Sequence, residues 1–246
     1  MRARGELRIG TSGWAYGDWR GRFYPGELKA AEYLAWYARR FDTTEINYSF
    51  YHLPQPKTFE KWRTQTPEGF VFAVKVSKII THTRRLDGVS EPWRTFLDNA
   101  SHLGARLGPL LLQFPPSFRC DRQRLEAFLE ESRELTGTRL AFEFRHASWF
   151  VPEVGDMLAR YGAARVIGQS SRYPCAPPEP TATFVYLRFH GPRELFASRY
   201  SEEELQVWAE RIRSWLKEGR TVYAYFNNEY SGYAIENAGM LANLAG

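Results

Sequence analysis

Cysteine is scarce in this sequence: Cys120 and Cys175 are the only two among 246 residues. They lie far apart and show neither the CxxC spacing nor the Cys/His clustering that structural zinc requires. A chain of this length also buries enough surface to fold without a disulfide bond or a structural metal ion. We therefore exclude a disulfide scaffold and a zinc-stapled fold, and the low cysteine content predicts a reducing compartment.

Long apolar runs are absent as well. No run approaches the roughly 20 residues of a membrane span. The basic start, MRARGELRIG, is not followed by the apolar region of a signal peptide. These absences predict a cytoplasmic protein without a membrane partner.

The excess of charge of one sign is small. The 33 Lys and Arg residues against 28 Asp and Glu residues give a formal net charge of +5. This excess favours anionic partners such as phosphates or nucleic acid, but it is too small and too dispersed along the chain to decide between them.

What the sequence does contain is a regular alternation. Short runs rich in β-branched and aromatic residues alternate with longer amphipathic stretches, which is the pattern of βα units and a parallel sheet. The predicted strands are residues 8–12, 43–48, 70–76, 109–114, 139–144, 165–168, 184–190 and 221–226. The predicted helices are residues 29–40, 56–64, 92–104, 122–135, 151–161, 202–218 and 232–244. This strand count in about 250 residues predicts an α/β protein with a TIM-type (β/α)8 barrel, as a single domain over residues 1–246.

Local signals refine this prediction. Ser201 followed by Glu204 predicts a capping box at the start of one helix, and Gly219 is placed to end that helix in the left-handed conformation. The segment QSSRYPCAPPEPTAT, residues 169–183, contains four prolines and cannot form an ordinary helix. We expect an irregular connection there, between the sixth and seventh strands.

Polar side chains alternate with apolar ones inside the predicted strands. Because successive strand residues point to opposite faces, one set of side chains faces the helices and the other faces the barrel axis. The axis-facing set carries polar groups at the carboxyl ends of the strands, where barrel enzymes build their active sites. The members that we single out are Glu45, Asn47, Lys75, Gln113, Glu143, Arg145, Arg188, His190 and Asn227. A purely structural network of ion pairs is the alternative, although buried charges cost several kcal/mol each unless they are paired.

Six motifs in order make the sequence recognisable. They are GTSGWAYGDWRGRFYP, EINYSFYHLP, LLLQFPP, FEFRHASWF, YLRFHG and YAYFNNEYSGYAIENA. Together they resemble the DUF72 family, also called YecE-like proteins, over the chain from Ile9 to Leu244. The resemblance implies a TIM-type barrel, and it supplies no catalytic residues to carry over. Likeness in barrel style to the endonuclease IV and xylose isomerase group suggests DNA or sugar substrates by analogy alone.

A metal site is not expected. Metal-assisted chemistry needs three or more His, Asp or Glu side chains that converge on one point. Among the histidines only His190 stands at a strand end on the axis-facing side, with Glu45 and Glu143 as its possible companions. The nearby Lys75, Arg145 and Arg188 would repel a cation. We expect neither a metal nor another cofactor.

The same residues suit acid–base chemistry on an anion. Glu45 and Glu143 form the carboxylate pair that general acid and base catalysis needs, with His190 as the third catalytic candidate. The guanidinium groups of Arg145 and Arg188 and the amine of Lys75 would bind phosphate or carboxylate. The candidates that would orient or stack on a substrate are Asn47, Gln113, Asn227, Tyr225 and Trp14. Lys75 could also form a Schiff base if desolvated, although acidic neighbours would keep it charged.

The sequence thus predicts a polar, metal-independent site at the carboxyl ends of the strands for a small anionic, phosphorylated or sugar-like molecule. It leaves open whether the site is catalytic. The alternative is a nucleic-acid-binding module that uses a basic, aromatic surface there, and an interaction scaffold is a third interpretation. The sequence gives no oligomeric state.

Overall fold

The computed structural model describes residues 5–246, in which every paired strand runs parallel to its neighbours. One sheet has the order β1-β9-β8-β7 and the other has the order β2-β3-β4-β5-β6. The strands are β1 (Leu7–Thr11), β2 (Thr43–Ile46), β3 (Val71–Lys75), β4 (Leu107–Gln113), β5 (Leu140–Glu143), β6 (Ala164–Arg165), β7 (Ile167–Gln169), β8 (Phe184–Phe189) and β9 (Thr221–Phe226). The protein is therefore an α/β protein with two parallel sheets.

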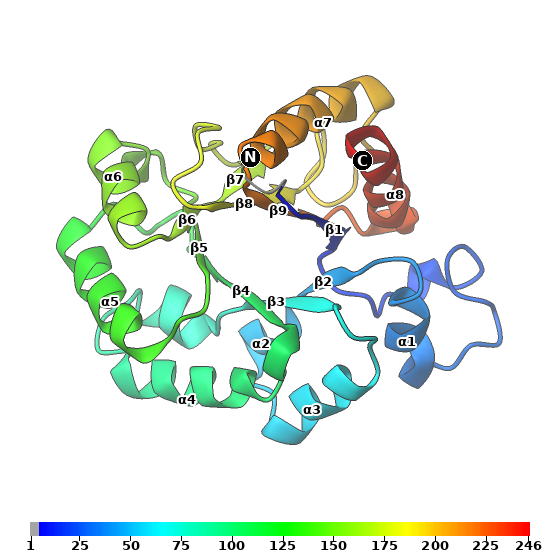
Figure 1. Ribbon diagram of the computed structural model, residues 1–246, viewed down its shortest axis with the longest axis horizontal. Coiled ribbons are helices and arrows are strands. Elements are labelled where there is room, and N and C mark those ends of the chain that lie inside the picture. The colour runs from blue at the N-terminus through cyan, green and yellow to red at the C-terminus, as the bar shows by residue number, and fades with distance from the viewer. Residues whose placement is uncertain (1–4) are drawn as a thin grey trace.

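Helices lie outside the strands (Figure 1). They are α1 (Tyr33–Tyr37), α2 (Tyr48–Tyr51), α3 (Pro56–Thr64), α4 (Ser90–Ser101), α5 (Arg122–Leu135), α6 (Pro152–Arg160), α7 (Glu202–Lys217) and α8 (Tyr233–Ala245). The predicted capping box is present at α7, where Glu204 N donates to Ser201 Oγ at 3.2 Å and Ser201 N donates to the Glu204 carboxylate at 2.8 Å. Gly219 follows that helix with φ of 83°, as predicted. None of the described helices combines the length and the apolar composition that a membrane crossing requires.

The two sheets lie next to each other at two places. The strand predicted at residues 165–168 is interrupted at Val166, so that β6 belongs to one sheet and β7 to the other. At the opposite edges, Ser12 just after β1 forms an isolated parallel bridge with Glu45 of β2. Residues 170–183 contain no helix, which agrees with the irregular proline-rich connection expected there.

Two predicted elements end earlier than expected. The strand predicted at 43–48 stops at Ile46, and Tyr48 instead begins α2, where Ser49 Oγ donates to the Lys75 carbonyl at 2.6 Å. The helix predicted at 29–40 is a 3-10 turn over Ala30–Glu32 followed by the short α1. The Tyr37 hydroxyl at the end of α1 accepts from Thr11 N at 2.9 Å and donates to the Thr43 carbonyl at 3.1 Å. These two hydrogen bonds tie the end of α1 to the end of β1 and to the start of β2.

The apolar side chains form two separate clusters. The large cluster lies between the strands and the helices and contains residues such as Leu112, Phe142, Leu187 and Phe226. A smaller cluster takes the alternate residues of the same strands, and its members include Ala73, Leu111, Ala141, Tyr186, Tyr223 and Tyr225. The predicted alternation of faces is therefore confirmed, and the polar side chains that end the strands continue the smaller cluster.

Candidate active site

Glu45 of β2 and Arg188 of β8 form a buried two-point ion pair. Arg188 Nε donates to Glu45 Oε2 at 3.0 Å, Arg188 Nη2 donates to Oε1 at 2.8 Å, and both side chains are 1% exposed or less. The Tyr186 hydroxyl and Ser12 Oγ each donate to the same carboxylate at 2.8 Å, and Asn47 Nδ2 does so at 3.2 Å. Burial by itself raises the pKa of Glu45, but the charge of Arg188 and these hydrogen bonds lower it below its ordinary value.

Glu143 of β5 is the second carboxylate of this network. Arg188 Nη1 donates to Glu143 Oε2, and Arg145 Nε donates to Oε1 at 2.8 Å. Burial opposes ionisation here too, but Arg188, Arg145 and then His190 together hold the pKa of Glu143 well below its ordinary value. Each of the three guanidinium nitrogens of Arg188 therefore donates to a carboxylate, and both carboxylates are ionised at neutral pH.

His190 is a neutral member of the network. Asn227 Nδ2 lies 3.0 Å from His190 Nδ1, and with the amide donating, the ring carries its proton on Nε2. That nitrogen is 3.4 Å from Glu143 Oε1, within ion-pair distance but without a formed hydrogen bond. Burial lowers the pKa of His190 to about 4, against the opposing pull of Glu143.

Lys75, the last residue of β3, differs from the other charged groups of the network. No hydrogen bond or ion pair joins its Nζ atom to another described residue, and Nζ lies 4.1 Å from the centre of the Phe50 ring. Burial and then the charge of Arg188 lower the pKa of Lys75 to about 7, although Glu143 and Glu45 oppose the shift. Two carboxylates thus face two guanidinium groups and one unpaired amine.

Arg145 lies at the accessible edge of the network. Its side chain is 11% exposed, and its guanidinium group stacks 4.3 Å from the centre of the Tyr173 ring in the proline-rich connection. Only Nε is used in the ion pair with Glu143. Its remaining N–H groups and Lys75 are the donors that this part of the structure leaves for an anion.

The remaining predicted site residues lie at different depths. Gln113 is buried beside Glu143 in the β4–β5 register, and its side chain donates to the Phe114 carbonyl at 2.6 Å. The Tyr225 hydroxyl lies 2.7 Å from Thr43 Oγ1, below the network in the inner cluster. Trp14 packs edge-on against Trp62 at 5.4 Å and is partly buried against the large apolar cluster outside the strands.

Glu229 is an ionisable group of this region that sequence reasoning passed over. It follows β9 in the loop NNEYSG, and burial raises its pKa to about 7. The Tyr16 hydroxyl lies 3.1 Å from Glu229 Oε1, and both residues line a cavity of about 380 Å³ together with Phe196 and Tyr230. An acidic residue just past the carboxyl end of a strand was the available signal, but nothing in the sequence shows that its loop is folded back against Tyr16.

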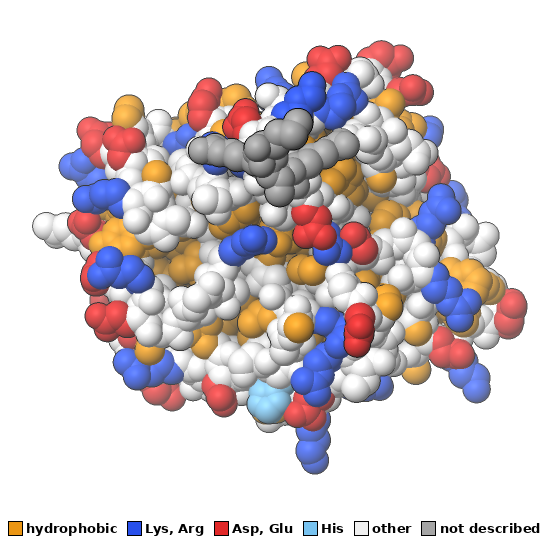
Figure 2. Space-filling view, viewed as in Figure 1, with side chains coloured by type: hydrophobic (Ala, Val, Ile, Leu, Met, Phe, Trp, Pro, Cys, Tyr) orange, Lys and Arg blue, Asp and Glu red, His pale blue; other side chains and the backbone are white. Residues whose placement is uncertain are grey.

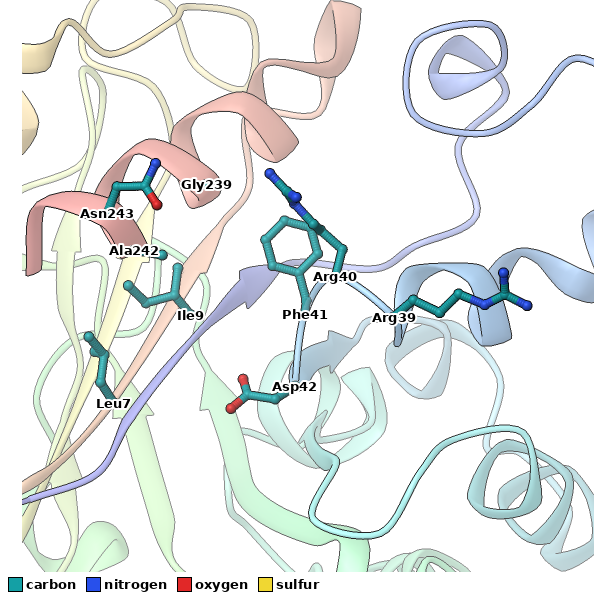
Figure 3. Close-up of a pocket in the computed structure, with 9 residues that line it drawn as sticks. All are labelled: Leu7, Ile9, Arg39, Arg40, Phe41, Asp42, Gly239, Ala242 and Asn243. Carbon is teal, nitrogen blue, oxygen red and sulfur yellow. The ribbon is translucent and has the colours of Figure 1, made fainter. Parts of the chain in front are cut away.

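Another cavity lies at the opposite end of the strands. It has a volume of about 610 Å³, and it is lined by the start of β1, the segment before β2 and the second half of α8 (Figure 3). Its polar lining residues are Arg39, Arg40, Asp42 and Asn243. None of the network residues borders it. Among residues 5–246, no group of three or more His, Cys, Asp or Glu side chains is arranged to hold a metal ion.

Comparison with known proteins places this arrangement in a family. The family model described as "Protein of unknown function DUF72" matches residues 8–246. The chain belongs to the DUF72 family. It is 26% identical to UPF0759 protein YunF of Bacillus subtilis over 97% of this chain and 94% of the relative, and 28% identical to UPF0759 protein YecE of Escherichia coli K12 over 73% of each. A solved DUF72 family protein from Thermotoga maritima superposes with a TM-score of 0.84 at 30% identity, covering 97% of this chain and 98% of that one. The DUF72 match includes every residue of the network.

The buried His190 predicts how the stability of this DUF72 protein depends on pH. A base whose pKa is lowered on folding stays neutral while the unfolded chain takes up a proton, so stability falls as the pH falls from about 6.5 toward 4. With the folded pKa near 4, we expect His190 to account for a drop of about 2 kcal/mol in the free energy of unfolding between pH 7 and pH 5, measured as the difference between the wild type and His190→Gln. The lowered pKa of His82 and the raised pKa of Glu229 add contributions of opposite sign that both proteins share. Urea titrations at both pH values measure this drop.

His190→Gln is expected to remove this contribution of about 2 kcal/mol from the pH dependence, whereas His52→Gln, at an exposed histidine, leaves the pH dependence as in the wild type. Below about pH 4.5 a second loss follows in the wild type, because the ionised forms of Glu45 and Glu143 are the ones that folding favours. A slope that is the same in all three proteins between pH 7 and 5 would exclude this role of His190.

Proposed function

We propose that this DUF72 protein is an enzyme with a polar, metal-independent active site at the carboxyl ends of its strands, acting on a small anionic, phosphorylated or sugar-like substrate. The observation that carries the proposal is the network of Glu45, Glu143 and Arg188 beside Lys75 and Arg145. A network that served stability alone would pair each charge, because an unpaired charge in a partly buried position is costly. Here three cationic groups, Lys75, Arg145 and Arg188, lie beside two carboxylates. The two cations that are only partly buried are Lys75 and Arg145.

The roles of the residues follow from their contacts. Arg188 donates to the two carboxylates through all three of its nitrogens, so in our proposal it holds them in place, while Arg145 and Lys75 bind the anion. The ionised Glu143 would act as the general base with the neutral His190 beside it. The aromatic walls of the cavity that Glu229 and Tyr16 line suit the faces of a sugar ring.

We also propose that the two sheets close into one eight-stranded (β/α)8 barrel. The bridge between Ser12 and Glu45 and the continuous chain through Val166 bring their edges together at both sides. The inner cluster supports the same closure, since Ala73, Leu111 and Ala141 come from one sheet and Tyr186 and Tyr223 come from the other. In a closed barrel the network would fill the end of the central core.

Inorganic phosphate is the probe that tests the anion site. For one site with a Kd near 1 mM, we expect 10 mM phosphate to raise the Tm by about 4 °C over chloride of equal ionic strength. Arg145→Gln and Lys75→Gln are expected to lose this shift, while Arg94→Gln, on the exposed side of α4, keeps it. Mass spectrometry of small molecules released from the purified protein then tests for a natural ligand. Equal shifts in all variants would refute the proposal.

The nucleic-acid alternative has a distinct signature, which is binding of an oligonucleotide that weakens steeply with salt. On the face seen in Figure 2, basic and acidic side chains are interspersed among the described residues. That face has no uniform basic surface of the kind that follows a phosphate backbone, so the alternative requires one at the carboxyl ends of the strands. Salt-dependent oligonucleotide binding that Arg145→Gln abolishes would support the alternative over the small-molecule enzyme.

A further inference from the structure

We infer that Lys75 is the reacting group of this site: its amine forms a Schiff base with the carbonyl carbon of a small aldehyde or ketone whose anionic group is held by Arg145. This inference rests on the proposed function for the anionic character of the substrate. It adds the chemical class, an aldehyde or ketone that bears a phosphate or a carboxylate, and it assigns a covalent step.

The contacts of Lys75 set it apart from every other cation of the network. Arg188 is held by two carboxylates and Arg145 by one, whereas Lys75 Nζ has no acceptor among the described residues. Phe50, in α2, covers one side of the amine at 4.1 Å from the ring centre. Lys75 as a residue is only partly buried, unlike Glu45, Glu143 and Arg188 of the same network, so the inference requires that Nζ be reached from the side that Phe50 leaves uncovered.

The surroundings of Lys75 also favour the neutral, nucleophilic form. Glu45 from β2 and Glu143 from β5 raise the pKa of Lys75, whereas the positive charges of Arg145 and of Arg188 from β8 lower it. The charge of Lys75 in turn lowers the pKa of His82, which lies in the turn after β3. Burial and Arg188 prevail, and the pKa of Lys75 falls to about 7. A large share of the amine is therefore unprotonated at neutral pH, which is the condition that Schiff-base lysines require.

The other lysines provide an internal comparison. Lys29, Lys57, Lys61, Lys78 and Lys217 are all exposed. Solvent surrounds these amines, whereas burial is the largest cause of the pKa shift at Lys75. Lys78 is the closest of them to Lys75 in the sequence, so it serves as the matched reference.

The step balances without an oxidant or reductant. The nitrogen lone pair of Lys75 attacks the carbonyl carbon, a C–N bond forms, and the carbonyl π pair moves to oxygen, which takes a proton. The resulting carbinolamine loses water as the nitrogen lone pair forms the C=N bond, so one amine and one carbonyl give one Schiff base and one water. The protonated Schiff base carries a positive charge, which the ionised Glu45 and Glu143 of the same network stabilise.

Reductive trapping tests this chemistry on the intact protein. The wild type is incubated with glycolaldehyde phosphate and cyanoborohydride, which converts a Schiff base into a stable secondary amine, and the modified lysine is located by peptide mass spectrometry. We expect Lys75 to be labelled at least about tenfold faster than Lys78 at pH 7. Uncharged glycolaldehyde is expected to lose most of that preference, because Arg145 then has no anion to hold.

The pH dependence is a second readout within the same samples. The ratio of labelling at Lys75 to labelling at Lys78 is expected to be high near pH 7 and to fall as the pH rises toward 10, where exposed lysines lose their protons too. Lys75→Arg removes the fast site and Lys78→Arg retains it. Because the label is mapped in the wild type, the result stands even if Lys75→Arg folds poorly.

The outcomes separate this inference from the proposed function. The Schiff-base inference is overturned if the label is spread evenly over the exposed lysines. It is also overturned if glycolaldehyde and glycolaldehyde phosphate label Lys75 at the same rate relative to Lys78. If phosphate still raises the Tm in an Arg145-dependent manner, the anion-binding enzyme survives without the covalent step. If neither the label nor the Tm shift appears, both proposals fall.

Discussion

Replacing Arg188 by methionine is expected to lower the free energy of unfolding by about 4 kcal/mol, because it leaves two buried carboxylates without their counter-charge. Glu45 is completely buried and Glu143 nearly so, and Arg188 contacts both. Methionine replaces only the aliphatic part of the Arg188 side chain, so the lost charge and hydrogen bonds dominate the effect and the space left by the guanidinium group adds to it. Urea denaturation followed by circular dichroism measures it.

A compensated variant distinguishes loss of pairing from loss of packing. In the triple variant Glu45→Gln, Glu143→Gln, Arg188→Met, neutral amides replace both carboxylates. The amide oxygen at position 45 can still accept from Tyr186 or Ser12, and the one at position 143 from Arg145. We expect the triple variant to recover more than half of the stability that Arg188→Met loses, since neutral replacements of a buried ion network are often tolerated. Arg94→Met, at an exposed arginine of α4, is the control and is expected to change stability by less than about 0.5 kcal/mol. A cost for Arg188→Met as small as that of the control would show that the network carries no such energy.

The faces of the strands could be predicted from the sequence because the backbone imposes a period of two. In β5, Phe142 belongs to the outer core while Glu143 faces the network, as the alternation requires. The same rule placed Arg188 and His190 on one side of β8 and Phe189 on the other. Cap signals worked equally well, because a capping box involves residues only three positions apart.

The partners within the network could not be predicted. Glu45, Glu143 and Arg188 stand on β2, β5 and β8, and nothing local to any of these segments decides whether an arginine meets a carboxylate or a ligand. The sequence suggested Arg145, Arg188 and Lys75 as equivalent anion binders, whereas their contacts differ: two guanidinium groups are committed to carboxylates and the amine is not. Loop placement was equally out of reach, which is why Glu229 was missed.

The network and the unpaired lysine follow from the same electrostatics. A buried carboxylate is stable only when cations approach it, and each cation that does so disfavours a further positive charge nearby. Glu45 and Glu143 therefore fix Arg188, and Arg188 in turn helps to lower the pKa of Lys75. In this way residues that hold the fold together also prepare a reactive amine at its edge.

Replacing Gly10 by alanine is the second change with a large expected effect, because it acts where β1 meets β2. A Cβ atom on Gly10 would lie 2.2 Å from the Thr43 carbonyl oxygen and 2.9 Å from the Tyr37 hydroxyl. Real side chains do not approach backbone so closely, so the two strands must move apart. We expect a loss of about 3 kcal/mol in the free energy of unfolding, the upper range for an overpacked core.

Gly168 in β7 is the matched control, because a Cβ atom there meets nothing within 4 Å. Gly168→Ala is expected to change stability by less than about 1 kcal/mol. Hydrogen exchange gives a local readout for Gly10→Ala: the Thr11 amide, which donates to the Tyr37 hydroxyl at 2.9 Å, should exchange faster than in the wild type. If Gly10→Ala matches Gly168→Ala in both measurements, β1 and β2 are not held at this distance in solution, and the closed barrel that we propose loses the contact at one of its two seams.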